Sequence, residues 1–232
     1  MKVLAITCHP DDMEILCCGT LIKCIKRGDT VTVCHVANGN MGHEVILPEE
    51  LRKIRLAEAQ KSAQLAGIKT ITTDIGDLLV DGANIEQRDK IAQVIRQEQP
   101  DFIITHAPND YMSDHRAVAK LVFDASFVAS VPHYGTGDCA EVTPIYYMDT
   151  DKGINNIPTE YVDISAEIDL KIKMLECHES QVKWIKDHDD VDLIEEALTI
   201  SRFRGLQCNC KYAEAFTQEL VFPKIVAKRL LP

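Results

Sequence analysis

The sequence predicts an α/β fold, a Rossmann-like sandwich in which a mainly parallel sheet carries helices on both faces. Short apolar runs rich in β-formers alternate with longer helical patterns, as in proteins built from strand–helix–strand units. The 232 residues, 46% of them hydrophobic, suffice for one sizeable core. We find no repeat, low-complexity tract or linker, so we expect residues 1–232 to form a single domain.

The N-terminal third sets the pattern. Val3 to Cys8 is an apolar run that ends at His-Pro, and it predicts a buried strand. A helical pattern follows from Met13 to about Lys26 and is broken by residues 27–29. Residues 30–36 form a second β-branched run, and the Gly- and Asn-containing stretch 37–42 is a loop. Two strands joined by a helix imply a parallel pair.

The alternation continues through the middle of the chain and then loosens beyond Val131. The last elements that we expect are a strand at Ile145 to Met148 and a helix from Ala166 to His178, followed by a less regular tail. The elements expected between the first loop and Val131 are helices over 48–66, 85–97 and 114–130, and strands over 69–74 and 101–105.

Composition excludes several classes of function. The formal net charge is −11 with no dense basic block, which argues against a nucleic acid or an anionic membrane as partner. The N-terminus reaches a charged Pro-Asp-Asp by residue 12, unlike a signal peptide, and no apolar run approaches the roughly 20 residues that span a bilayer. Nine scattered cysteines suit reduced thiols. We therefore expect a cytoplasmic protein.

Two polar clusters follow predicted strands. Residues 9–14, His-Pro-Asp-Asp-Met-Glu, come after the first strand, and residues 106–115, which begin and end with His, come after the strand at 101–105. Ligands of open α/β sheets bind beyond the carboxyl ends of the strands. The two clusters should therefore converge in space.

Two imidazoles and one carboxylate form a usual catalytic zinc set with a fourth position open for water, whose pKa falls to about 7. A second carboxylate must then take the proton of that water, and the adjacent Asp11 and Asp12 can divide these tasks. The alternative is structural. Asp11 with Glu14 fits a helix capping box, and Ser113 could cap the next helix. The spacing of the residues leaves both interpretations open.

The run from His9 to Leu21, HPDDMEILCCGTL, resembles the signature of LmbE-like, or PIG-L, de-N-acetylases, and so does DYMSDHRAV at residues 110–118. This family includes zinc enzymes of bacillithiol and mycothiol synthesis and deacetylases of chitooligosaccharides. Weaker matches cover most of the chain. They are Asn38-Gly39, Gly42, Arg55 with Glu58, Asp77, Lys173, His178 to Gln181, and Tyr212 to Phe216.

The resemblance implies zinc ligands His9, Asp12 and His115, with Asp11 as general base. It implies hydrolysis of the acetamide of an N-acetylglucosamine-type sugar or conjugate, which releases acetate and a free amine. Another divalent ion such as Fe²⁺ would suit the same ligands. A small-molecule substrate and a homo-oligomer, trimer or hexamer, are further expectations from the family.

Each of three further residues has both a functional and a structural interpretation. Arg55 matches a substrate-contacting arginine, suited to a carboxylate or phosphate on the aglycone, or it is a helix-surface residue paired with Glu58. Asp114 is expected to orient a ligand imidazole, unless it is only a first-turn helix residue. His178 is expected near the substrate, unless it is a core histidine.

The sequence departs from the family at one functional position. Many members have a histidine three residues before the last ligand, and here that residue is Met112, which cannot donate a proton. Tyr111 is the nearest candidate donor, with His43 and His106 further away. Two alternatives therefore stand beside the deacetylase, a metal-binding protein without activity and an amidohydrolase of a non-sugar amide. A nucleotide-binding protein is disfavoured because residues 8–14 carry three carboxylates, which would repel phosphate.

Overall fold

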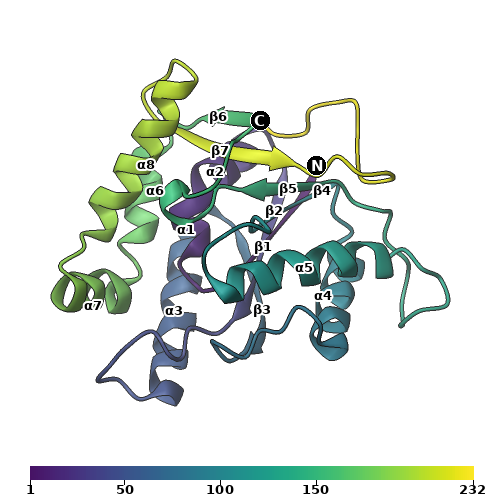
Figure 1. Ribbon diagram of the computed structural model, residues 1–232, viewed down its shortest axis with the longest axis horizontal. Coiled ribbons are helices and arrows are strands. Elements are labelled where there is room, and N and C mark those ends of the chain that lie inside the picture. Colours follow the sequence, from purple (N-terminus) through teal and green to yellow (C-terminus); the bar gives the residue numbers. More distant parts are fainter.

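A seven-stranded sheet, in the order β3-β2-β1-β4-β5-β7-β6, forms the centre of the computed structural model, which describes residues 1–232 (Figure 1). Strands β1 to β5 pair in parallel, and β7 pairs antiparallel with both β5 and β6. The predicted fold class is confirmed. The strands are β1 (Lys2–Thr7), β2 (Thr30–Ala37), β3 (Lys69–Ile75), β4 (Phe102–Thr105), β5 (Ile145–Met148), β6 (Glu160–Asp163) and β7 (Ala213–Gln218).

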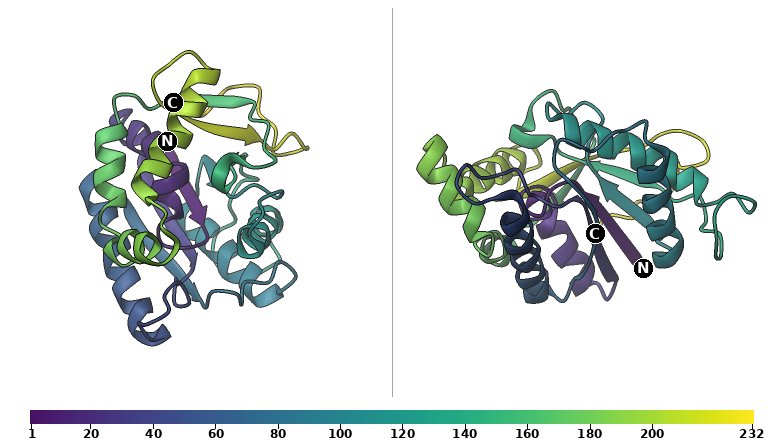
Figure 2. Two further views of the ribbon diagram at one scale, coloured as in Figure 1. Left: turned by 60° about the vertical axis from the view of Figure 1, so that its left-hand side comes forward. Right: turned by 90° about the horizontal axis from the view of Figure 1, so that it is seen from below.

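Helices cover both faces of the sheet (Figure 2). They are α1 (Asp12–Leu16), α2 (Cys18–Lys26), α3 (Pro48–Ala66), α4 (Ile85–Glu98), α5 (Ser113–Val128), α6 (Ile168–Leu175), α7 (Glu179–Asp189) and α8 (Leu193–Gln207), with a 3-10 turn η1 (Asp151–Gly153) after β5. No helix combines the length and the apolar character that crossing a bilayer requires.

Strand β1 shows why the sheet needs two layers of helices. Val3 and Ala5 belong to one core cluster with side chains of α1, α2 and α6, whereas Leu4 and Ile6 belong to a second cluster with α4 and α5. Successive side chains of a strand point to opposite faces, so a continuous apolar run is buried on both. The pattern from which the sequence predicted a buried strand therefore corresponds to two hydrophobic cores.

The order of the strands creates a crevice next to β1. The chain runs from β1 to β2 and β3 on one side and then crosses over, so that β4 lies on the other side of β1. The loops after β1 and β4 therefore leave the sheet in opposite directions, which is where ligands bind in such sheets. Both polar clusters of the sequence follow these two strands.

The helix predicted from Met13 to Lys26 is two helices, broken at Cys17, whose φ is −144°. The carboxylate of Glu214 on β7 accepts hydrogen bonds from the backbone N–H groups of Gly19 and Thr20, at 2.8 and 2.7 Å. It thereby satisfies donors that the start of α2 leaves free. Lys171 Nζ pairs with the same carboxylate at 2.5 Å. The break thus depends on a residue nearly 200 positions further along the chain, beyond the reach of a local pattern.

The prediction of a less regular tail is wrong. Residues 179–218 contain α7, α8 and the six-residue strand β7. Only one residue of α7, Gln181, is buried, and Val182 and Ile185, which pack on a small core cluster, are a short apolar signal in an otherwise polar helix. Strand β7 is fixed by antiparallel pairing with β5 and β6, a tertiary contact that the sequence pattern does not show. None of the nine cysteines takes part in a disulfide.

Candidate active site

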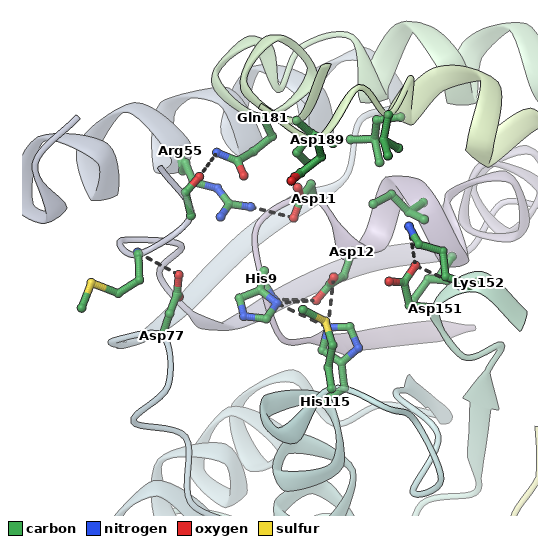
Figure 3. Close-up of a pocket in the computed structure, with 18 of the residues that line it drawn as sticks. His9, Asp11, Asp12, Arg55, Asp77, His115, Asp151, Lys152, Gln181 and Asp189 are labelled. Atoms are coloured by element: carbon green, nitrogen blue, oxygen red, sulfur yellow. Dashed lines mark hydrogen bonds and ion pairs between the residues drawn. The ribbon is translucent and has the colours of Figure 1, made fainter. Parts of the chain in front are cut away.

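The loop after β1 and the first turn of α5 bring His9, Asp12 and His115 together (Figure 3). His115 Nε2 lies 3.3 Å from His9 Nδ1 and 3.3 Å from Asp12 Oδ1, and His9 Nδ1 lies 3.5 Å from Asp12 Oδ2. The convergence predicted from the positions of the two polar clusters is confirmed.

These separations fit a metal ion. Zinc binds nitrogen at 2.0 to 2.1 Å in tetrahedral sites, which places neighbouring ligand atoms about 3.3 Å apart. The distance of 3.3 Å between the two imidazole nitrogens agrees with that edge length, and the distances of 3.3 and 3.5 Å from these nitrogens to the two oxygens of the Asp12 carboxylate are close to it. The thiol of Cys8 belongs to the same group of donor atoms, but burial raises the pKa of Cys8 to about 12, so this thiol stays protonated at neutral pH.

The charges around this cluster also favour a cation. Burial alone would raise the pKa of Asp12, but His115 and His106 hold it well below its usual value. Burial lowers the pKa of His115, but the carboxylates of Asp12 and Asp110 outweigh this effect and raise it to about 9. An ionised carboxylate and an imidazole that readily takes up positive charge therefore meet at one point.

The imidazoles of His9 and His115 each have a carboxylate near the ring nitrogen that is not part of the cluster. Asp114 Oδ2 lies 3.5 Å from His9 Nε2 and accepts a hydrogen bond from the Leu78 N–H at 2.8 Å. Asp110 Oδ2 lies 3.2 Å from His115 Nδ1. Such partners fix the orientation of ligand imidazoles. Asp114, expected to orient an imidazole, thus contacts His9 rather than its neighbour in sequence, and sequence reasoning missed Asp110 as the partner of His115.

His106 contacts the cluster, with Nε2 3.1 Å from Asp12 Oδ2, but it is not among the residues that line the pocket. Its ring stacks on that of His115 with centroids 3.9 Å apart, and its Nε2 accepts a hydrogen bond from the Cys8 N–H at 2.9 Å. Burial lowers the pKa of His106 to about 4, so the ring is neutral at physiological pH. The side chain is fully buried and does not line the pocket, which excludes it as a donor to substrate.

Asp11 points into the pocket and is held by Arg55 of α3. Arg55 Nη2 donates a hydrogen bond of 2.7 Å to Asp11 Oδ1, and Nη1 donates one of 3.3 Å to the carbonyl of Gly39. Arg55 is only 3% exposed, so the alternative of a surface arginine is wrong, and Glu58 bonds instead to Ser180. The guanidinium lines the pocket, and its carboxylate partner there is Asp11, the residue expected to act as general base.

The two capping alternatives are also wrong. Neither Asp11 nor Met112, the N-cap residues of α1 and α5, makes a side-chain capping hydrogen bond. Glu14 accepts a hydrogen bond from the hydroxyl of Ser62 at 2.5 Å, and Ser113 lies within α5 rather than before it. The side chains of Asp11 and Glu14 therefore do not cap the start of α1.

The loop after β2 forms a rim of the pocket, and the side chains of Arg55, Asp77 and Gln181 hold it by hydrogen bonds to its backbone. Asp77 accepts hydrogen bonds from the N–H groups of Gly39 and Met41, at 2.8 and 3.0 Å. Gln181 of α7 donates one of 3.3 Å to the carbonyl of Gly42, and Asp77 and Gln181 are labelled in Figure 3. Gly39 has φ of +76°, and a Cβ there would lie 2.6 Å from the Arg55 side chain. Only glycine fits at this position.

Tyr111 and Met112 also line the pocket. The hydroxyl of Tyr111, which is half exposed, donates a 3.0 Å hydrogen bond to Asp151 Oδ2. Burial and the neighbouring Asp151 carboxylate raise the pKa of Tyr111, so the phenol remains a neutral donor. Asp151 lies in η1, and no local feature of the sequence marked it.

His178 does not reach the pocket. It is fully buried, and its Nε2 lies 3.3 Å from Oε1 of Glu14, itself fully buried. This placement matches the alternative of a core histidine. Gln181, three residues further on, lines the pocket instead.

The pocket has a volume of ≈ 520 Å³, within the range of small-molecule sites. The three clustered donors and Asp11 line it, and so do aliphatic side chains of α1, of α7 and of the start of α8. The fold and this cluster define an α/β protein with a candidate metal centre of catalytic type at the switch point of its sheet.

Comparison with known proteins identifies the family. The sequence profile described as GlcNAc-PI de-N-acetylase, PIG-L, matches residues 4–126. The chain is 31% identical to the diacetylchitobiose deacetylase of Thermococcus kodakarensis, over 92% of this chain and 81% of that protein. The chain belongs to the PIG-L (LmbE-like) family of de-N-acetylases. Its deacetylase relatives place it among enzymes that act on amides.

Two solved structures show the same architecture. The N,N'-diacetylchitobiose deacetylase of Pyrococcus horikoshii has a TM-score of 0.82 and 28% identity, over 94% of this chain and 83% of that one. The 4-carboxy-2-hydroxymuconate hydratase of Pseudomonas putida has a TM-score of 0.83 and 23% identity, over 99% and 100%. At this identity the second likeness shows the fold alone.

Proposed function

We propose that the protein is a zinc-dependent hydrolase that removes the acetyl group from an N-acetylglucosamine-type sugar or its conjugate. The observation that carries the proposal is the set His9, Asp12 and His115 at tetrahedral spacing, with Asp11 beside it in the pocket. A divalent ion held by these three residues, zinc or Fe²⁺, would polarise the amide carbonyl and acidify water.

Asp11 is the proposed proton carrier. Its carboxylate takes a proton from the attacking water and returns it to the leaving amine, acting first as base and then as acid. Arg55 fixes the position of that carboxylate through the 2.7 Å hydrogen bond, and the 10% exposure of the Asp11 side chain leaves it open to the pocket. The pair is thus arranged to orient the base rather than to bind an anionic substrate.

Tyr111 is the proposed hydrogen-bond donor in place of the histidine that many family members have at the position of Met112. Met112 cannot donate a proton, whereas the neutral phenol of Tyr111 can turn from Asp151 toward a developing oxyanion. Stabilisation by such a donor acts only when negative charge develops on the substrate, so it lowers the barrier more than it strengthens substrate binding.

The direct test is release of acetate. The zinc-loaded protein is incubated with N-acetylglucosamine, its methyl glycoside and N,N'-diacetylchitobiose, and free acetate and free amine are measured. We expect equal amounts of both from the wild-type protein and none from Asp11→Asn. A folded, zinc-loaded protein that releases acetate only from N-acetylated non-sugar amides would replace the substrate class, and one inactive on all amides would favour the alternative of lost catalysis.

The family also suggests a homo-oligomer, and a trimer or hexamer is part of the proposal. Sedimentation equilibrium of the zinc-loaded protein tests it, because a mass near the 26.0 kDa of one chain would contradict it.

A further inference from the structure

We infer that the pocket selects an uncharged aglycone with an apolar face, such as an alkyl or aryl group, and rejects aglycones that carry phosphate or carboxylate. This inference rests on the proposed deacetylation and specifies its substrate. It follows from an aliphatic wall of the pocket and from the ion pairs in which Arg55 and Lys152, the two basic side chains of the lining, already take part.

The wall is aliphatic and comes from three segments of the chain. It combines side chains of α1 with side chains of α7 and of the α7–α8 junction, and the partly exposed members turn carbon surface toward the pocket. Its members are Ile15, Leu16, Ile185, Val191 and Leu193. Apolar surface removed from water is the main favourable term in binding at such a wall.

Neither cation of the pocket is free for an anionic ligand. Arg55 is bonded to Asp11 and to the carbonyl of Gly39. Lys152 pairs with Glu196, and its Nζ lies 3.8 Å from Asp151. A phosphate or carboxylate on the aglycone would have to break one of these pairs before it found a partner.

The carboxylates of the pocket outnumber its cations. Besides the two imidazoles, which are neutral when they hold a metal ion, five acids and two bases line it, an excess of three negative charges, of which a bound divalent ion would cancel two. Like charges brought together in a binding site are strongly unfavourable. The five acids are Asp11, Asp12, Asp77, Asp151 and Asp189, and the bases are Arg55 and Lys152.

A second sugar ring also suits this wall poorly. Most of its hydroxyl groups would face aliphatic carbon, because apart from Asp12 of the cluster the polar lining residues of the segments that build the wall are Gln181 and Asp189 alone. Hydroxyls buried without partners weaken binding. Apart from the two imidazoles of the cluster, the only aromatic ring among the lining residues is that of Tyr111, which lies in the loop before α5 and not in the segments that build the wall. An alkyl or aryl group loses nothing on the same contact.

The first experiment measures kcat/KM of the zinc-loaded protein. The substrates are the methyl, butyl and hexyl β-glycosides of N-acetylglucosamine, N,N'-diacetylchitobiose and N-acetylglucosamine 1-phosphate. We expect kcat/KM to rise by up to about fourfold for each methylene that the wall buries. We expect the 1-phosphate to fall at least tenfold below the methyl glycoside. A flat alkyl series, or a 1-phosphate as good as the methyl glycoside, overturns the inference and leaves deacetylation standing.

Two variants assign the effect to the wall. Ile185→Ser places a hydroxyl in it and should lower the ratio of kcat/KM for the hexyl glycoside to that for the methyl glycoside. Ile194→Ser is the matched control, because Ile194 packs against the same small core cluster as Ile185 but does not line the pocket. It should keep the wild-type ratio. Equal ratios in both variants would overturn the assignment to this wall.

Binding to Asp11→Asn separates the inference from the proposed function. Calorimetry with this zinc-loaded variant should give a lower Kd for the butyl than for the methyl glycoside whether or not the wild-type protein turns either over. Equal Kd values overturn the inference, whereas a preference for butyl without any acetate release from the wild type supports the wall and overturns the activity.

Discussion

Replacing Arg55 by Met should weaken both the fold and the proposed catalysis, because the guanidinium is the buried partner of the proposed base. Arg55 Nη2 and Asp11 Oδ1 are 2.7 Å apart, and the two side chains are 4% and 10% exposed. Methionine has similar length and fills the space, but it leaves the carboxylate of Asp11 without its partner. Arg52→Met is the matched control, since Arg52 lies one turn earlier on α3 and pairs with Asp74 at the surface.

The magnitude follows from burial. Removal of one partner of a buried ion pair costs about 3 to 5 kcal/mol, and access of water to Asp11 through the pocket favours the lower end. For a chain of this size about 1 kcal/mol lowers Tm by roughly 2 to 4 °C, so a fall of about 6 to 12 °C is expected. A base released from its position should also lose roughly 100-fold in kcat/KM. The exposed pair of the control contributes little.

Thermal unfolding followed by circular dichroism, with acetate release from the methyl glycoside, measures both effects. A control variant with wild-type Tm and activity shows that loss of an arginine on α3 is not itself harmful. An Arg55→Met protein that matches the control in Tm and in kcat/KM would refute the role of the guanidinium.

Three further variants test the supports of the site. Glu214→Gln should lower the free energy of unfolding in urea by about 3 kcal/mol, because it weakens the start of α2 and leaves buried Lys171 unpaired; an unchanged midpoint would contradict this. Gly39→Ala should reduce both stability and activity, whereas Gly28→Ala, also at positive φ but with no atom within 4 Å of its Cβ, should reduce stability alone; equal activity in the two would exclude the clash. Met112→His should keep or raise kcat if Met112 merely replaces a donor, and a folded but inactive variant would contradict that view.

The parts of the site that the sequence revealed are those with local signals. The segments around His9 and His115 each follow an apolar strand, and parallel strands end at one edge of a sheet, so their convergence could be predicted. The sheet as far as β5 was predictable for the same reason. Strands β1, β4 and β5 are buried on both faces and appear as continuous apolar runs between helical patterns.

The remaining features depend on contacts between distant residues. The pairing of Arg55 with Asp11 joins α3 to the loop after β1. The position of Asp151 depends on the turn after β5. The sequence suggested a role for Arg55 in substrate binding, because no pattern tells whether a guanidinium meets a ligand or a carboxylate of its own chain. His178 was expected near the substrate because it lies in a segment that matches the family. Its full burial depends on tertiary packing, which the sequence does not show.

The most direct test of the account compares two adjacent aspartates. Asp11→Asn and Asp12→Asn are loaded with zinc, and zinc content per chain and kcat are measured together. We expect Asp11→Asn to hold zinc as the wild type does and to lose turnover, and Asp12→Asn to lose the metal. Full zinc occupancy in Asp12→Asn, or wild-type kcat in Asp11→Asn, would contradict the division of tasks between the two carboxylates.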